Sequence, residues 1–172
     1  MSIQIRRWTG ADGSETKDNI TDTNTRFLAS DSHTVAGTSN PVLIPDSGTN
    51  YSYKASTRLY YDGSGTGTID NIKWYTDGDN NLGTGIGLNV KTASTYSQAT
   101  GTEGETGDEM TGGSDAFDYT SANPLSVTGS VTDPANEDVG DFVELQSTVG
   151  TTASAGTSTQ ETVTWRYDST IA

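Results

Sequence analysis

An eleven-residue run of alternating side chains is the feature of this sequence that most limits its fold. Between residues 51 and 61 the odd positions carry Tyr, Ala, Thr and Leu, and the even positions are mostly small polar or basic. Successive side chains of a β-strand point to opposite faces, so a period of two predicts a half-buried antiparallel strand. A helix would need apolar residues at intervals of three and four instead.

The rest of the chain repeats this pattern of short alternating runs separated by turn residues. No window keeps a helical apolar stripe, and Gly, which occurs 20 times, interrupts the chain together with Asp and Pro. Strands are expected over residues 3–8, 42–44, 51–61, 69–75, 87–93, 125–131, 141–146 and 161–167. We therefore predict an all-β fold, an antiparallel β-sandwich of immunoglobulin-like or jelly-roll type. The predicted core residues are Tyr53, Leu59, Ile72, Trp74, Leu88, Val90, Val127, Val131, Phe142, Leu145, Val163 and Trp165.

The chain of 172 residues has the length of a single globular domain. Residues 1–45 are expected to form an extended N-terminal segment or arm with short strands, because most of them are polar and turn-rich. Residues 46–172 are expected to form the sandwich. One long acidic loop is predicted over residues 99–123, with Met110 and Phe117 embedded in it. A loop of this length either binds a partner or packs on its own domain, and both remain open.

The charge of the chain excludes two classes of partner. There are 23 Asp and Glu residues against 9 Lys and Arg, which gives a formal net charge of −14. A field of that sign repels phosphate, so we expect neither a nucleic-acid nor a membrane partner. Basic residues are expected on strand faces opposite the core, at Lys54, Arg58, Lys73, Lys91 and Arg166. Such faces are usually solvated, and the alternative is that they dock an acidic partner.

Side chains that perform chemistry are scarce in this sequence. There is no Cys, which excludes disulfides, thiolate zinc sites and Cys nucleophiles. The single histidine, His33, lacks both the nucleophile elbow of a Ser-His-Asp triad and the spacing of a zinc site. The acids crowd into a Gly-rich loop, whereas catalytic carboxylates need a rigid pocket to tune their pKa values. We therefore expect no enzymatic activity and no cofactor.

The turn that begins at Asp77 resembles a calcium-binding loop, and Asp77 and Asp79 are candidate ligands of a weakly bound calcium ion. An EF-hand loop would have Gly at its sixth position and Glu at its twelfth, where this chain has Leu82 and Leu88. A hairpin turn is the better interpretation, because Asp, Gly and Asn are residues that turns favour.

Several stretches together resemble small acidic β-sandwich structural proteins of tailed-phage virions. They are IQIRRWTGADGSET at 3–16, NIKWYTDGDNNLGTGIGLNV at 71–90, YSQATGTEG at 96–104, PLSVTGSVTDPANEDVGDFVELQ at 124–146 and ETVTWRYD at 161–168. The resemblance runs over most of the chain and rests on turn patterns and aromatic strand positions. It implies a bacteriophage capsid decoration or cement protein that binds the major capsid protein or another virion protein and stabilises the shell.

The resemblance also implies where the protein acts and how it assembles. The N-terminus lacks the apolar region of a secretion signal, which fits assembly in the host cytoplasm followed by exposure on the virion surface. A decorating protein occupies symmetry-related sites, so we expect a homo-oligomer, with a trimer favoured. The candidate contact residues are Ile3, Ile5 and Trp8 near the N-terminus and Met110 and Phe117 in the long loop.

Two alternatives to a capsid role remain. One is a tail or neck component of the same kind of virion. The other is a carbohydrate-binding or adhesin module in which exposed aromatic rings stack on sugars. The rings available for that role are Tyr51, Tyr60, Tyr61, Tyr75 and Tyr96.

Overall fold

The structure, a computed structural model that describes residues 2–35 and 37–172, has β-strands as nearly all of its regular secondary structure, joined by long irregular segments. Its single helical element in that part of the chain is one 3₁₀ turn, and no helix there is long and apolar enough to cross a membrane. The elements are β1 (Ser2–Thr9), β2 (Thr16–Asn19), β3 (Thr49–Tyr51), β4 (Ala55–Ser64), β5 (Thr68–Tyr75), β6 (Ile86–Ala93), β7 (Gly101–Thr102), β8 (Thr106–Gly107), β9 (Ser114–Asp115), η1 (Ala116–Asp118), β10 (Leu125–Ser126), β11 (Val131–Thr132), β12 (Ala135–Gly150) and β13 (Thr164–Ser169).

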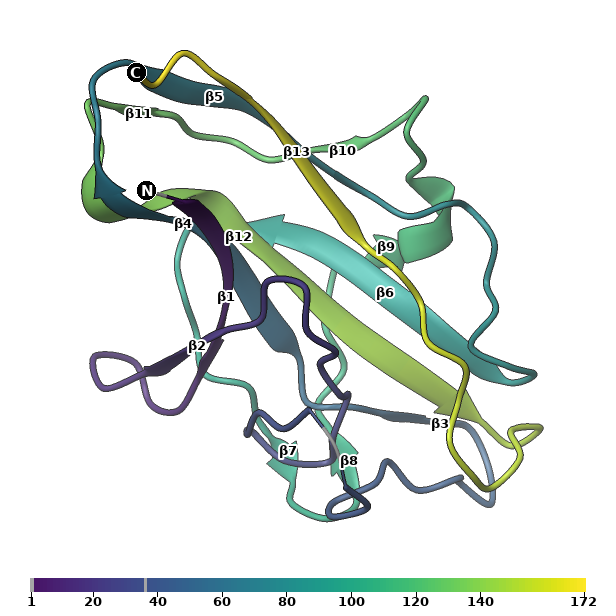
Figure 1. Cartoon of the computed structure of the whole chain (residues 1–172). Coiled ribbons are helices and arrows are strands. Elements are labelled where there is room, and N and C mark those ends of the chain that lie inside the picture. The colour runs from purple at the N-terminus through teal and green to yellow at the C-terminus, as the bar shows by residue number, and fades with distance from the viewer. Residues whose placement is uncertain (1, 36) are drawn as a thin grey trace.

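The larger sheet is organised around β12, which is 16 residues long. Its strand order is β2-β1-β4-β12-β6-β9, and β3 pairs with the far end of β12. All of these pairings are antiparallel. Figure 1 shows β4, β12 and β6 side by side along the body of the molecule.

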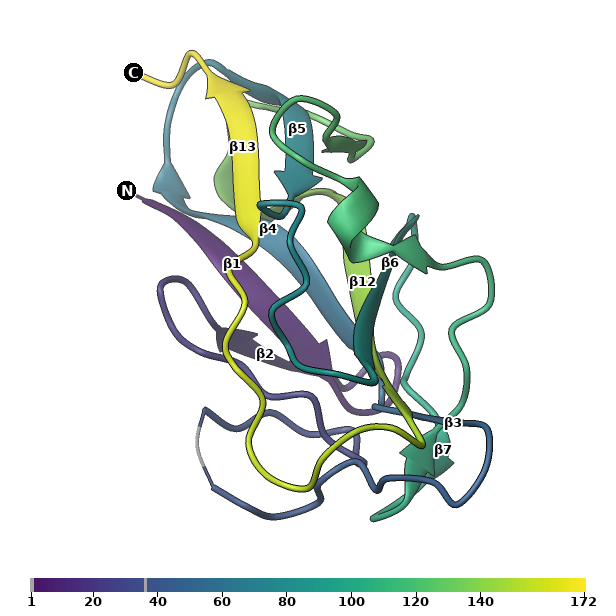
Figure 2. The ribbon, with the colours of Figure 1, turned by 90° about the vertical axis from the view of Figure 1, so that its right-hand side faces the viewer.

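The smaller sheet is organised around β5. The strand β13 pairs with one edge of β5, and β10 and β11 pair with the other edge. Figures 1 and 2 show this sheet lying over one face of the larger sheet. The prediction of an all-β, antiparallel, sandwich-like arrangement is therefore confirmed, and the choice between immunoglobulin-like and jelly-roll topology stays a prediction.

The hydrophobic core lies between the two sheets. Among the predicted core residues, those fully inside it are Leu59, Ile72, Trp74, Leu88, Val90, Val127 and Leu145. Val131, Val163 and Trp165 are partly buried and pack against it.

Phe142, also predicted as a core residue, is buried at 2% exposed, but it lies outside the cluster between the sheets. It packs on the outer face of the larger sheet, against Trp8. The reason is strand alternation: Val143 and Leu145 face the core, so Phe142 must point the other way.

The alternating run at residues 51–61 forms two strands and not one. Its predicted inward face is correct within β4, where Ala55, Thr57, Leu59 and Tyr61 are all buried. Between β3 and β4 the chain leaves the ladder. The N–H of Tyr53 donates to the carbonyl oxygen of Leu28 at 2.8 Å, so this interruption joins the sheet to the N-terminal loops.

The N-terminal strand β1 is an integral part of the larger sheet. Its register with β4 runs from Ser2 opposite Asp62 to Trp8 opposite Ser56, and β2 pairs with its other edge. Residues 2–9 are therefore a sheet strand and not a projecting arm. The segment that follows β2 is irregular but contributes buried side chains, among them Ile20 and Leu28. Met1 and Ala36, which belong to the predicted segment 1–45, lie outside the described residues.

Candidate interaction surfaces

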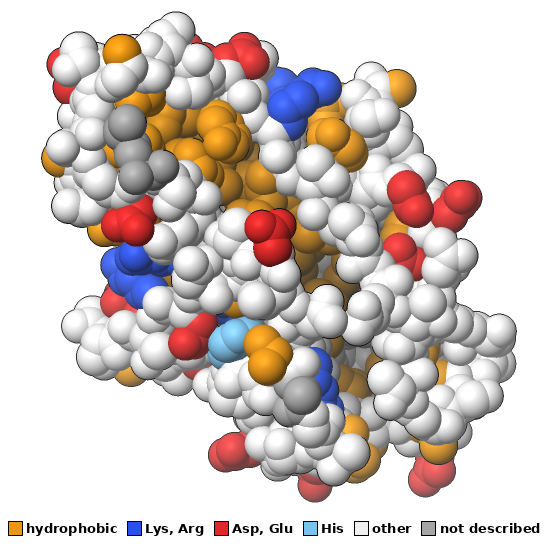
Figure 3. All heavy atoms as spheres, in the orientation of Figure 1, with side chains coloured by type: hydrophobic (Ala, Val, Ile, Leu, Met, Phe, Trp, Pro, Cys, Tyr) orange, Lys and Arg blue, Asp and Glu red, His pale blue; other side chains and the backbone are white. Residues whose placement is uncertain are grey.

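An apolar groove opens on one side of the sandwich, between β1 of the larger sheet and β13 of the smaller one. Its volume is about 260 Å³, and its lining residues are Ser2, Ile3, Tyr61, Ile69, Tyr167, Ser169 and Ile171. None of these side chains is charged. Figure 3 shows hydrophobic side chains gathered at this side of the molecule, in the upper left of the view where the two termini lie in Figure 1. We call this feature the groove.

Strand edges flank the groove on both sides. Among the described residues, β13 has β5 as its one strand neighbour, so its outer edge is unpaired. β1 pairs with β2 only over Arg6–Thr9, so the edge of β1 at Ser2–Gln4 has no strand beside it in the described chain. Unpaired edges present rows of N–H and C=O groups that can bind another extended segment.

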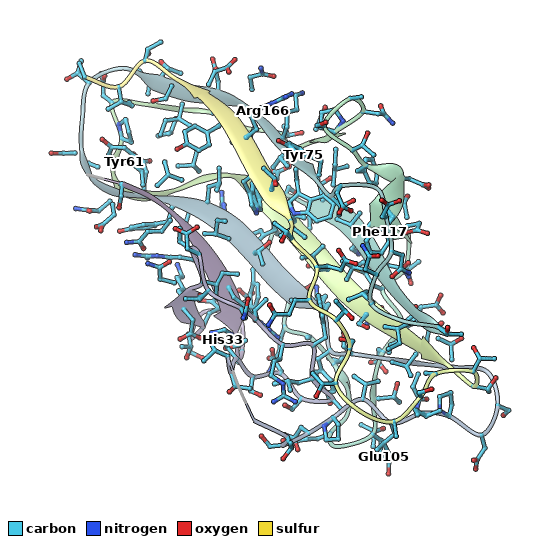
Figure 4. The ribbon with its side chains drawn as sticks, turned by 45° about the vertical axis from the view of Figure 1, so that its right-hand side comes forward. His33, Tyr61, Tyr75, Glu105, Phe117 and Arg166 are labelled. Atoms are coloured by element: carbon cyan, nitrogen blue, oxygen red, sulfur yellow. The ribbon has the colours of Figure 1, made fainter. Side chains whose placement is uncertain are left out.

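The hydroxyl group of Tyr61 is buried in the wall of the groove without a hydrogen-bond partner. The residue is 3% exposed, and its oxygen has no donor or acceptor within reach among the described residues. Figure 4 places Tyr61 between the two sheets. Leaving a hydroxyl unsatisfied costs about 1–3 kcal/mol.

A second apolar surface lies in the loop between β2 and β3. The large hydrophobic side chains that are exposed in the described chain all belong to this loop: Val35 at 54%, Leu43 at 45% and Ile44 at 38%. Leu43 and Ile44 belong to the sequence Pro41-Val42-Leu43-Ile44-Pro45, which forms no strand despite the prediction for residues 42–44. We call residues 41–45 the proline-flanked segment. Figures 1 and 2 show the chain between β2 and β3 at the lower end of the molecule, opposite both termini.

The five predicted contact residues do not form one surface. Ile3 lines the groove, and Ile5 packs against the core beside it. Trp8, Met110 and Phe117 are buried within this chain. Contact of these three with a partner would require their side chains to leave this packing, and so it stays a prediction.

The ring of Trp8 is in contact with three other side chains of this chain. It meets the ring of Phe142 edge-on at 4.8 Å between centroids and that of Tyr96 at 5.5 Å. The ammonium group of Lys17 lies 3.7 Å from the Trp8 ring centroid.

The basic face of the larger sheet is covered by the chain's own long loop. Glu144, 1% exposed, accepts a hydrogen bond from the Lys54 ammonium at 2.5 Å, and the Lys91 ammonium lies 3.4 Å from its other oxygen. Lys54 also donates to the Ser97 hydroxyl at 2.6 Å. The acidic partner of Lys54 and Lys91 is therefore an internal glutamate, and this part of the face is only partly open to solvent, with the Lys54 side chain 14% and the Lys91 side chain 31% exposed.

A polar cavity of about 220 Å³ lies above this ionic cluster. It is lined by Lys54, Lys91, Ser97, Gln98, Thr100, Asp108, Glu109, Met110 and Thr111. The loop is anchored beside it by Gln146, whose side-chain oxygen accepts the Met110 N–H at 2.7 Å and whose amide donates to the Asp108 carbonyl oxygen at 2.7 Å. The cavity is thus a gap between the long loop and the sheet that carries it.

The aspartates proposed as calcium ligands take part in a turn. A side-chain oxygen of Asp77 accepts the N–H of Asp79 at 2.9 Å, which is the local bond expected of a turn-forming Asp. Within residues 2–35 and 37–172, no three His, Asp or Glu side chains gather in a way that could hold a metal ion. Calcium binding by Asp77 and Asp79 stays a prediction.

The tyrosines considered as a sugar-binding platform do not share one face. Tyr60 and Tyr61 lie on opposite faces of β4, and the guanidinium carbon of Arg6 lies 3.2 Å from the centroid of the Tyr60 ring. Tyr96 donates its hydroxyl proton to the Gly10 carbonyl oxygen at 2.8 Å. Burial raises the pKa of Tyr96, as expected of a phenol fixed in this position.

The groove and the unpaired Tyr61 hydroxyl could not be foreseen from the sequence, because Tyr61 stands there as one more inward-facing residue of an alternating run. The proline-flanked segment did leave a signal: three consecutive aliphatic residues between two prolines. Comparison of the chain with protein-family models, with curated proteins and with solved structures finds no match.

Proposed function

We propose that this chain is a non-enzymatic structural protein of a tailed-phage virion. In this proposal it decorates or cements the capsid through contacts with the major capsid protein or another virion protein, and it is exposed on the virion surface after assembly in the host cytoplasm. The observation that carries the proposal is the pair of uncharged apolar surfaces, the groove and the proline-flanked segment, at opposite ends of an otherwise acidic molecule. Concentrated apolar surface of this kind marks sites of protein–protein contact.

Such a protein would stabilise a shell by mass action. A protein that binds the assembled lattice and not the free subunits shifts the equilibrium towards the lattice. The net charge of −14 keeps free copies apart and soluble until they dock. The lining of the groove and the proline-flanked segment carry no charged side chain.

The test is co-sedimentation of the purified chain with empty shells made from the major capsid protein of the same genome. We expect binding at a fixed ratio to the capsid subunits and a higher melting temperature of the decorated shell. Deletion of residues 1–9 would be a poor probe, because it removes β1, the strand that joins β2 to β4 in the larger sheet. Shells that sediment without the chain at saturating concentrations would refute the capsid role.

Two further measurements separate the alternatives. Immunogold labelling of native particles distinguishes the shell from the tail or neck. A glycan array distinguishes a carbohydrate-binding module, for which specific and concentration-dependent hits are required.

A further inference from the structure

We propose that copies of this chain associate head to tail, with the proline-flanked segment of one copy lying in the groove of the next. This inference deepens the proposed function by naming a second copy as partner. It is tested on the purified protein alone, so that its failure and that of the capsid role can be told apart.

The proline-flanked segment has the properties of an inserted strand. Val42, Leu43 and Ile44 are aliphatic, and Leu43 and Ile44 are exposed to water in the single chain. Proline fixes its own φ at about −65° and disfavours the helical region for the residue before it, so Pro41 and Pro45 limit the conformations of the segment. A segment with fewer accessible conformations loses less entropy on binding.

The groove has the properties of an acceptor for such a strand. Its apolar floor is bordered by the unpaired edges of β13 and of Ser2–Gln4 in β1. β13 is six residues long, and the segment has five residues, so that an extended segment of roughly 16 Å could lie alongside β13. Addition of a strand to a free edge places alternate side chains in the pocket, which here would be either Leu43 or the pair Val42 and Ile44.

Charge favours this pairing over contacts elsewhere on the surface. Two copies, each of net charge −14, repel one another. Residues 34–45 contain no charged side chain, and neither does the lining of the groove. The charged side chains of β13 are Arg166 and Asp168, which are of opposite sign, so this strand brings no net charge to the contact. Added salt should strengthen the contact by screening the remaining repulsion.

The Tyr61 hydroxyl supplies a specific polar contact. It is buried in the groove wall and unpaired in the single chain. Every residue of the proline-flanked segment, including its prolines, carries a carbonyl oxygen that can accept a hydrogen bond. Because the Tyr61 oxygen is out of reach of solvent in the single chain, the wall of the groove must shift on docking before the Tyr61 hydroxyl can donate to one of these carbonyls.

The geometry determines the kind of assembly. The two surfaces are different and lie at opposite ends of the molecule, so the contact is heterologous and produces rings or open chains. A closed ring agrees with the trimer expected for a decorating protein. One segment in one groove buries less than the roughly 1,200 Å² of a stable pairwise interface, so isolated copies should dissociate readily on dilution.

The test uses sedimentation velocity of the purified chain across micromolar to millimolar concentrations, at low and high salt. Two variants each remove one surface: Leu43→Glu in the segment and Ile171→Glu in the groove. The matched control is Val35→Glu, which adds the same charge at an exposed residue of the same loop outside the segment. We expect oligomers that grow with concentration for the wild type and the control, and monomers for the two variants.

Mixing the two variants gives the decisive result. Leu43→Glu retains a groove and Ile171→Glu retains a segment, so an equimolar mixture should form dimers and nothing larger. Because Ile171 packs against the core, Tyr61→Phe serves as a second groove variant that preserves the ring. It should weaken association by roughly 3- to 10-fold through loss of one hydrogen bond.

Three results would overturn the inference. The first is a wild type that stays monomeric at every concentration and salt condition. The second is association that survives Leu43→Glu. The third is association that Leu43→Glu abolishes but both groove variants leave intact, which would mean that segments pair with each other. A monomeric wild type that binds shells through the groove would assign the groove to another virion protein, leaving the capsid role intact.

Discussion

The substitution Tyr61→Phe gives the sharpest test of the groove, because it should change the stability of the single chain and its self-association in opposite directions. In the single chain the Tyr61 hydroxyl is buried and makes no hydrogen bond with any described residue. Phenylalanine keeps the aromatic ring in the core cluster and removes only this oxygen. The substitution therefore removes a desolvation cost without opening a cavity around the ring.

The magnitude follows from the cost of an unsatisfied hydroxyl, about 1–3 kcal/mol. Taking the lower end, because the groove opens to solvent nearby, we expect the free energy of unfolding to rise by about 1 kcal/mol. For a chain of this length, a gain of that size raises Tm by roughly 2–4 °C. The assay is urea unfolding followed by tryptophan fluorescence, at concentrations low enough to keep the protein monomeric.

Tyr96→Phe is the matched control. It makes the same chemical change at a hydroxyl that does donate a hydrogen bond, to the Gly10 carbonyl oxygen at 2.8 Å. That variant should lose about 1 kcal/mol, since it leaves the carbonyl without its partner. If both variants are destabilised to the same extent, the Tyr61 hydroxyl has a partner in the folded chain, and our account of the groove fails.

Three further predictions concern the rest of the molecule. Glu144→Gln should lower the free energy of unfolding by about 2–4 kcal/mol, because it leaves Lys54 and Lys91 without their buried counter-charge. Urea titration measures this loss, and a loss near zero would mean that the cluster is not ionic. NMR titration of the single histidine should give a midpoint below 6.5, since burial and then the nearby Arg7 charge lower the pKa of His33. The unfolded chain then binds more protons than the folded one between that midpoint and pH 6.5, so stability should rise with pH across that window, and His33→Asn should remove the rise. Gly107→Ala should detach the β7–β8 hairpin, because a Cβ atom there would collide with the Ser52 carbonyl oxygen; limited proteolysis should then cut within residues 99–113 faster than in the wild type.

The strands could be predicted because their signal is local. Alternation within residues 55–61 and 72–75 gives both the presence of a strand and the face it buries, and both features agree with the structure of β4 and β5. Ile69 departs from the alternation, since it is buried together with Ile72, and Asn71 between them has a positive φ. Phe142 is buried as predicted, but on the outer face of the larger sheet and not in the cluster between the sheets. Phe142 and Leu145 are three positions apart, so they cannot both face the core of one regular strand.

The contacts between distant parts of the chain could not be predicted, because nothing local encodes them. Lys54 and Glu144 lie 90 residues apart in sequence and meet across the pairing of β4 with β12. The N-terminal strand is a similar case, since its place in the sheet depends on β4, some fifty residues later. The groove is harder still, because it exists where the edges of two sheets fail to meet.

The proposed head-to-tail contact and the acidic surface together set the conditions for assembly. Electrostatic repulsion between copies reaches across roughly a Debye length, about 8 Å at physiological ionic strength. The apolar contact acts only at touching distance and is small. Free copies of this chain are therefore held apart by the electrostatic repulsion, which has the longer range of the two interactions. Copies bound to neighbouring sites of a shell are at a high effective concentration, which favours the second contact without adding to its strength. This combination of charge and contact area therefore predicts that copies bound to a shell associate at protein concentrations at which free copies in solution are still mostly dissociated.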